Sequence, residues 1–210
     1  AASDVYKRQE GLTSIEKIAA NDESIVATAH YYKGLYFSNI KNTSMAVQEF
    51  HEAITVETNE DERTFYIEKY IMERLKETSP MELLTSVRNY TNETFSKDSK
   101  AKLVLLLASL YEKMNDAVMA TVCRTKAVAL SPSVDKERFD VAYKAPDSLK
   151  MLAALQYDIL ISRQDENLAA LNNLGVICQN NSMPIKGFSL YRRAMSGGEA
   201  LAAANIAFKY

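Results

Sequence analysis

The chain of 210 residues contains little glycine, proline or cysteine. It has six glycines, four prolines, two cysteines and no tryptophan. Because glycine and proline interrupt helices, their scarcity predicts long helices joined by short connections. The cysteines, Cys123 and Cys178, are far apart and lack CxxC spacing. This favours two small buried side chains in a reducing compartment over a disulfide, and on this basis we expect a cytoplasmic protein.

Long hydrophobic runs and a strong net charge are also absent. The longest uninterrupted apolar run covers only residues 103–108, whereas a membrane-spanning helix needs about 20 residues. We therefore expect no membrane segment in this sequence. The formal charge of -2 provides no electrostatic attraction to nucleic acid, and basic residues do not interleave with the twelve tyrosines, as a single-strand-binding surface requires.

Signatures of catalysis are missing as well. The sequence contains no GxSxG, P-loop, GxGxxG or HExxH motif, and three Ser-x-x-Lys matches lack the elements that accompany a nucleophilic serine. His30 and His51 lie on different predicted helices without acidic or cysteine neighbours at ligand spacing, so we expect packing or surface residues there. We expect a protein that is not an enzyme and has neither a cofactor nor a metal.

A spacing of small and aromatic residues organises the chain. It begins at Gly34 and continues with Phe37 three residues later, Ala46 twelve residues later, Phe50 sixteen residues later and Ala53 nineteen residues later. Small residues at these intervals let two antiparallel helices approach closely, and aromatic residues one turn away fill the space between neighbouring pairs.

The same spacing returns twice downstream. Measured from Ala108, it places Arg124 where the second aromatic is expected and otherwise meets Tyr111, Ala120, Ala127 and then Pro132. Measured from Gly175, it meets Cys178, Gly187, Tyr191 and Ala194. Because one helix pair cannot bury its own apolar face, such pairs stack on copies of themselves and form a solenoid.

These residues resemble the tetratricopeptide repeat (TPR) family, whose unit of about 34 residues carries this pattern and often ends in proline. The resemblance implies an all-α, right-handed superhelix over residues 10–210, with a degenerate repeat in each gap between the three copies. The helices are expected at 11–20, 25–38, 43–56, 61–77, 80–95, 100–114, 116–130, 135–144, 148–162, 166–179, 184–195 and 199–210. The period of 32 residues between Asn173 and Asn205, with Gly197 and Gly198 in the connection, resembles the Sel1-like variant.

In that family, the first helix of each pair lines a concave groove that binds proteins or extended peptides. The resemblance places these side chains in the groove: Thr28, Tyr31, Leu35, Ser38, Lys102, Leu105, Ser109, Glu112, Ala169, Asn172, Val176 and Gln179. From this set we expect peptide contacts from Tyr31, Leu35, Lys102, Ser109, Asn172 and Val176. An inward amide at Asn172 would bond a peptide backbone, and the alternative is a solvated polar residue on a helix face.

The first nine residues, AASDVYKRQ, look like a translated sequencing adaptor. We therefore predict a foreign leader at 1–9 and a repeat domain at 10–210 that is truncated at the N-terminus and at the C-terminus. The function that the resemblance implies is a non-catalytic scaffold that binds a protein or an extended peptide. Two alternatives stay open. The chain could be a sensor or oligomerisation arm of a larger enzyme or transcriptional regulator, or an architectural subunit with a large permanent interface.

Overall fold

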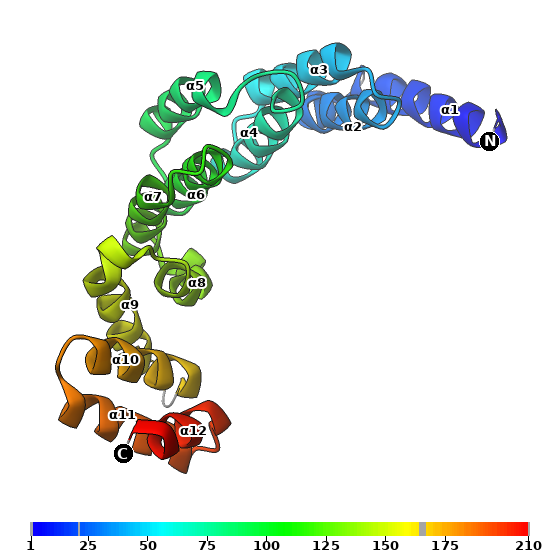
Figure 1. Cartoon of the computed structure of the whole chain (residues 1–210). Helices are drawn as coiled ribbons and strands as arrows, with labels where there is room; N and C mark the ends of the chain where they lie inside the picture. Colours follow the sequence, from blue (N-terminus) through cyan, green and yellow to red (C-terminus); the bar gives the residue numbers. More distant parts are fainter. Residues whose placement is uncertain (1, 21, 164–166, 210) are drawn as a thin grey trace. The chain divides into compact units, whose positions relative to one another are not determined.

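The computed structural model describes residues 2–20, 22–163 and 167–209, with side chains from Glu10 onward. In these residues the chain forms α-helices and short 3-10 helices, and no strand (Figure 1). The α-helices are α1 (Ala2–Ala19), α2 (Val26–Asn39), α3 (Thr43–Val56), α4 (Glu60–Arg74), α5 (Pro80–Glu93), α6 (Lys97–Lys113), α7 (Ala117–Leu130), α8 (Arg138–Tyr143), α9 (Lys150–Arg163), α10 (Leu168–Asn180), α11 (Pro184–Ser196) and α12 (Ala200–Lys209). The 3-10 helices are Glu23–Ile25, Pro132–Glu137 and Asp147–Leu149.

The predicted all-α helical repeat is confirmed, and most helix boundaries fall within a few residues of the prediction. Ser79 caps the start of α5: the Glu82 backbone N–H donates to its hydroxyl, and Pro80 is the first helical residue. Two boundaries differ. The expected helix at 135–144 divides into a 3-10 helix and the six-residue α8, and the expected start of α10 at Glu166 lies outside the described residues.

Helix α1 begins at Ala2, nine residues before the expected start at Gly11. Ala2, Lys7, Arg8 and Gln9 are good helix formers, and residues 2–9 contain no glycine or proline that would interrupt the helix. That these residues are a foreign leader stays a prediction.

The turns carry a repeat signal that the spacing of small residues did not include. Three non-glycine residues have a left-handed backbone: Lys41 with φ 61°, Asn115 with φ 59° and Ser182 with φ 59°. Each lies seven residues after the first small residue of a copy, namely Gly34, Ala108 or Gly175. Such a conformation is unfavourable for residues with a Cβ. Its recurrence at one position therefore supports a common backbone geometry of the turn itself in all three copies.

The chain divides into two compact units, Ala1–Met114 and Asn115–Tyr210. In unit 1, α2 packs along α3, and a Cβ added to Gly34 would lie 2.6 Å from the Phe50 ring. Helix α4 packs on α3 and α6, and α5 packs on α6.

The first degenerate repeat, expected between the first two copies of the spacing, would pair the helices at 61–77 and 80–95. In the structure these are α4 and α5, and neither makes its main contact with the other. The sequence explains this difference, because no glycine or alanine occurs between Ala53 and Ala101. Without small residues at the crossing, two backbones cannot approach closely. The Glu60 carboxylate, at the start of α4, instead accepts hydrogen bonds from the backbone N–H groups of Phe95 and Ser96 at 2.9 and 2.7 Å. These bonds attach the α5–α6 connection to α4.

Unit 2 repeats the close approach of unit 1. Helix α10 packs along α11, and a Cβ added to Gly175 would lie 2.6 Å from the Tyr191 ring. The buried side chain of Arg138 holds the start of α8, because it donates to Asp135 on the preceding 3-10 helix, to Gln156 of α9 and to the Val128 carbonyl of α7. The core extends from Ala142 through α9 and α10 to Ala202 of α12.

The structure also locates every residue that the repeated spacing selected for packing. Phe37 is partly buried. The other residues are buried: Gly34, Ala46, Phe50, Ala53, Ala108, Tyr111, Ala120, Ala127, Gly175, Gly187, Tyr191 and Ala194. Arg124, at the missing aromatic place, is also partly buried and lies 4.0 Å from Glu137.

Candidate functional site

An aromatic cluster joins α2 to α4 in unit 1. The Tyr31 ring lies 5.3 Å from both Tyr66 and Phe65 of α4, and 5.4 Å from its neighbour Tyr32. Burial raises the pKa of the Tyr31 hydroxyl, and Tyr32 and Tyr66 raise it further. Tyr32 is 48% exposed and Phe65 is 37% exposed. The cluster is therefore part core and part accessible aromatic surface. Thr28, another predicted groove residue, is hydrogen-bonded to Tyr66.

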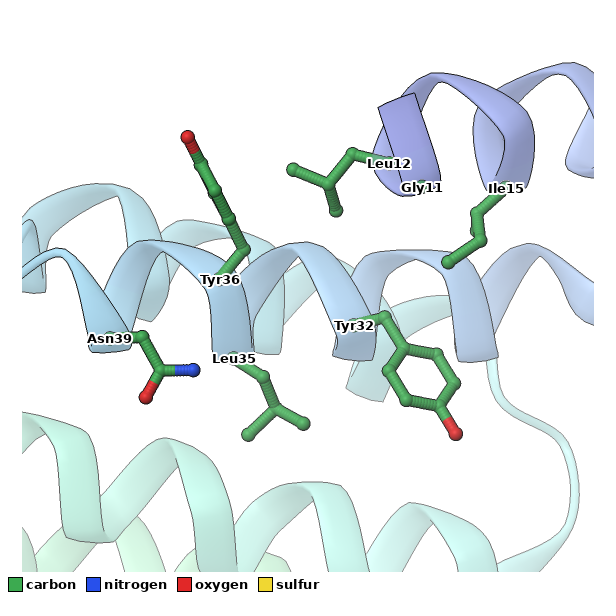
Figure 2. Close-up of a pocket in the computed structure, with 7 residues that line it drawn as sticks. All are labelled: Gly11, Leu12, Ile15, Tyr32, Leu35, Tyr36 and Asn39. Atoms are coloured by element: carbon green, nitrogen blue, oxygen red, sulfur yellow. The ribbon is translucent and has the colours of Figure 1, made fainter. Parts of the chain in front are cut away.

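A cavity of about 360 Å³ lies beside this cluster, between α1 and α2. Figure 2 shows Leu12 and Ile15 of α1 above α2, with the Tyr36 side chain pointing upward beside Leu12 and the Tyr32, Leu35 and Asn39 side chains lying lower. Gly11 also lines the cavity. Tyr32 belongs to both features, so the cavity and the aromatic cluster form one continuous apolar surface.

Polar groups continue this face at the end of α2. The Ser38 hydroxyl donates to Glu73 of α4 at 2.8 Å. The Lys76 ammonium donates to Glu73 at 2.7 Å and to Ser38 at 3.0 Å. Glu73 is only 5% exposed, and these bonds compensate the cost of burying its carboxylate. Glu73 lies 35 residues after Ser38, and no spacing in the sequence indicated this contact.

The predicted residues of α6 are engaged locally. Lys102 donates to Asp61 of α4 at 3.1 Å, and Ser99 donates to the same carboxylate oxygen at 2.9 Å. Hydrogen bonds from these two groups lower the pKa of Asp61. Ser109 donates to the Leu105 carbonyl within its own helix at 3.2 Å. Leu105 is partly buried and Glu112 is exposed.

In unit 2, the predicted face of α10 is partly occupied by other parts of the chain. Asn172 is only 5% exposed, and its side-chain oxygen accepts from the Asn205 amide of α12 at 2.9 Å. Its own amide donates to Asn173 at 3.3 Å, and Asn173 donates to the Tyr157 hydroxyl at 3.0 Å. The amide expected to hold a peptide thus joins helices in this conformation. Val176 packs against the unit 2 core, and Ala169 and Gln179 are partly buried.

The titratable groups are arranged as structural contacts. His30 lies 2.7 Å from Glu49, and the His51 ring lies 5.6 Å from that of Tyr70. The described residues contain no group of three or more His, Cys, Asp or Glu side chains that could hold a metal ion. Cys123 and Cys178 are free thiols and both are buried. In the described part of the chain, no helix has the length and apolarity needed to cross a membrane.

Comparison with known proteins places this geometry among helical repeats. No family model and no curated protein matches the sequence. Solved structures do match. MamA is 13% identical with a TM-score of 0.56, over 86% of this chain and 96% of that chain. YrrB, described as a TPR protein with an unusual peptide-binding site, is 13% identical with a TM-score of 0.56, over 91% of this chain and 96% of that chain.

A third similar structure is BtubC from P. vanneervenii. It is 11% identical with a TM-score of 0.56, and the match covers 98% of this chain and 91% of that chain. At these identities the likeness is one of fold. The Sel1-like character near Gly197 stays a prediction. The fold of this chain is therefore an α-helical repeat like that of TPR proteins, as the recurring small and aromatic residues predicted.

Proposed function

We propose that this protein is a non-catalytic scaffold that binds a protein or an extended peptide. The observation that carries the proposal is the continuous surface of α1, α2 and α4, where the cavity between Leu12 and Leu35 adjoins the exposed rings of Tyr32 and Phe65. Large contiguous apolar surfaces rimmed by polar residues mark interaction sites. YrrB, a TPR protein of similar fold, is described by its peptide-binding site, which supports the same use here.

The chemistry of this surface suits an extended peptide. The cavity of about 360 Å³ can receive an apolar side chain, while Tyr32 and Phe65 offer rigid aromatic area. The Ser38 hydroxyl at the end of α2 and the half-exposed Lys76 ammonium just after α4 lie beside the buried Glu73 carboxylate, where they can bond a peptide backbone. Specificity would come from the spacing between the apolar anchor and these polar groups.

The test begins with peptides selected from a phage-displayed library of random peptides on the full chain. Binding is then measured by fluorescence anisotropy with the double variant Tyr32→Ala, Leu35→Ser. We expect affinity to fall at least about 10-fold, since anchors of this kind each contribute more than about 1 kcal/mol. Tyr143→Ala, which removes a tyrosine that is 68% exposed in unit 2, is the matched control and should leave binding unchanged. Equal binding by the double variant and the wild type would contradict the proposed site.

A further inference from the structure

Unit 2 also contains a cavity, which is separate from the aromatic cluster of unit 1 and from the predicted groove. It has a volume of about 290 Å³ and lies between α9, α10 and the start of α11. Its walls are formed by Met151, Ala154, Leu155, Asp158, Leu174, Ile177, Cys178, Met183 and Lys186. These three helices follow one another along the chain (Figure 1).

The mouth of this cavity is surrounded by exposed apolar side chains. Met151 is 66% exposed, Leu155 is 52% exposed and Met183 is 38% exposed. On α9, the lining residues 151, 154, 155 and 158 follow the spacing of one helix face over two turns. Exposed apolar residues gathered at a hollow indicate a docking surface, whereas single scattered ones need no explanation. Methionine suits such a surface because its flexible thioether adapts to a partner.

One acidic and one basic side chain border the same cavity. Asp158 ends the α9 face, and Lys186 lies in the first turn of α11. Neither side chain forms an ion pair or a side-chain hydrogen bond with any other described residue. Burial raises the pKa of the Cys178 thiol, with a smaller lowering by Lys186 and a smaller raising by Asp158. Both charges are therefore within electrostatic reach of the cavity wall.

This surface, which we call the α9–α11 patch, faces away from the predicted groove. Leu174, Ile177 and Cys178 line the cavity, whereas Asn172 and Val176 occupy the predicted groove face of the same helix. At about 100° per residue, the two sets lie on nearly opposite sides of α10. A partner on the α9–α11 patch would therefore not contact the side of α10 that Asn205 of α12 covers.

We propose that the α9–α11 patch is a self-association surface, in which a second copy of this chain docks about a two-fold axis. Such an axis through the cavity mouth exchanges the places of the two charges, so that Asp158 of each copy faces Lys186 of the other. The same rotation sets the exposed methionines and Leu155 of one copy against those of the other. An isologous interface of this kind requires a surface that is complementary to itself.

Charge is the reason for assigning a second copy rather than an unrelated partner. A patch of one sign calls for a partner of the opposite sign, but this patch carries both signs beside one apolar centre and is matched by its own rotated image. The apolar centre is small compared with the roughly 1,600 Å² that a standard stable interface buries. We therefore expect a reversible dimer that dissociates on dilution.

The test is a charge exchange in the full chain, followed by sedimentation equilibrium over a range of concentrations. Asp158→Lys and Lys186→Asp should each weaken dimerisation at least about 10-fold, because each puts like charges face to face. The double variant carrying both changes restores opposite pairing and should recover most of the wild-type association. Arg192→Asp, on another side of α11, is the matched control and should associate as the wild type does.

Three results would overturn the proposal. The first is a wild-type chain that stays monomeric at every concentration. The second is association that persists unchanged in both single variants, which would place the contact elsewhere on the chain. The third is a double variant no better associated than the single ones, although its far-UV circular dichroism and melting curve match those of the wild type. Peptide binding at the α1–α2–α4 surface is measured separately, so it can fail or succeed independently of these outcomes.

Discussion

The α2–α3 and α10–α11 pairs are built by the same packing device in two different units. In each pair a glycine on the first helix lies against an aromatic ring on the second, Gly34 against Phe50 and Gly175 against Tyr191. A left-handed residue then reverses the chain seven positions after the glycine. The correspondence shows that close approach within a pair is set by a few steric requirements.

The contacts of these pairs with the next helix differ. Helix α2 meets α4 through the stacked rings of Tyr31 and Tyr66, while α10 meets α12 through the amides of Asn172 and Asn205. The first contact adds the Ser38–Glu73 bond and leaves accessible aromatic surface, and the second is a chain of partly buried amides. The packing within a helix pair therefore recurs in both units, whereas the contact between a pair and the following helix differs.

The largest expected effect tests whether the two pairs are equivalent. Phe50→Ala and Tyr191→Ala each empty a site that is 0–2% exposed, and we expect each to lower the free energy of unfolding by about 3–5 kcal/mol. Urea denaturation followed by circular dichroism measures the loss. Phe95→Ala, at a side chain that is 88% exposed, is the control and should cost less than about 0.5 kcal/mol. Losses in the free energy of unfolding that differ severalfold between the two buried sites would show that the two helix pairs are not equivalent.

A somewhat smaller effect tests the glycines beneath those rings. Gly34→Ala and Gly175→Ala each place a Cβ 2.6 Å from ring carbons that a packed core cannot move freely, so we expect a loss of about 1–3 kcal/mol. Gly11→Ala is a close control, because its Cβ would meet nothing within 4 Å in helix α1. At that position alanine should raise the free energy of unfolding by about 0.5–1 kcal/mol. A neutral Gly34→Ala would show that ring contact does not require glycine.

The sequence predicted the pairs well because their requirements are local. A small residue, a ring sixteen positions later and a short turn are all read from one stretch of chain, and Gly34 and Phe50 show this directly. The absence of glycine and alanine between Ala53 and Ala101 was also visible, and it accounts for why neither α4 nor α5 makes its main contact with the other. The left-handed turn has no sequence signal at Lys41 or Ser182, because neither residue is a glycine.

The candidate site could be predicted only in part. The family resemblance selected Tyr31 and Leu35, which lie in or beside the apolar surface of unit 1. It did not show that Asn172 is bonded to Asn205, because that contact joins residues 33 positions apart and depends on how one repeat sits on the next. For the same reason the Ser38–Glu73 bond had no sequence signal. Contacts between repeats depend on how one helix pair is rotated and translated relative to the next, and no single residue spacing encodes this.

A double-mutant cycle sharpens the difference between the two joints. Asn172→Ala and Asn205→Ala remove the two sides of one hydrogen bond, and their coupling energy should be about 0.5–1.5 kcal/mol. The cycle of Tyr31→Leu with Tyr66→Leu should give a similar coupling energy from ring stacking. Both are obtained from urea denaturation of the single and double variants. Additive losses at the asparagines would mean that the amide bond contributes nothing to the joint between α10 and α12.

The smallest expected effect concerns the turn that both pairs share. Lys41→Gly and Ser182→Gly relieve a left-handed backbone, which costs a residue with a Cβ roughly 1–2 kcal/mol, but glycine also makes the unfolded chain more flexible. We expect a net stabilisation of about 0.5–1 kcal/mol at each turn, visible as a higher midpoint in thermal melting. Asn115→Gly should gain less, because asparagine tolerates this conformation better.

Helical positions provide the control for these turn variants. Lys126→Gly, at an exposed site within α7, should instead lose about 1 kcal/mol, since glycine there only weakens the helix. If Lys41→Gly and Ser182→Gly destabilise the chain as Lys126→Gly does, the left-handed turn is not a strained feature of the repeat. Opposite signs at turn and helix positions would establish that the two units reverse direction by one backbone geometry, which glycine fits better than the residues now present.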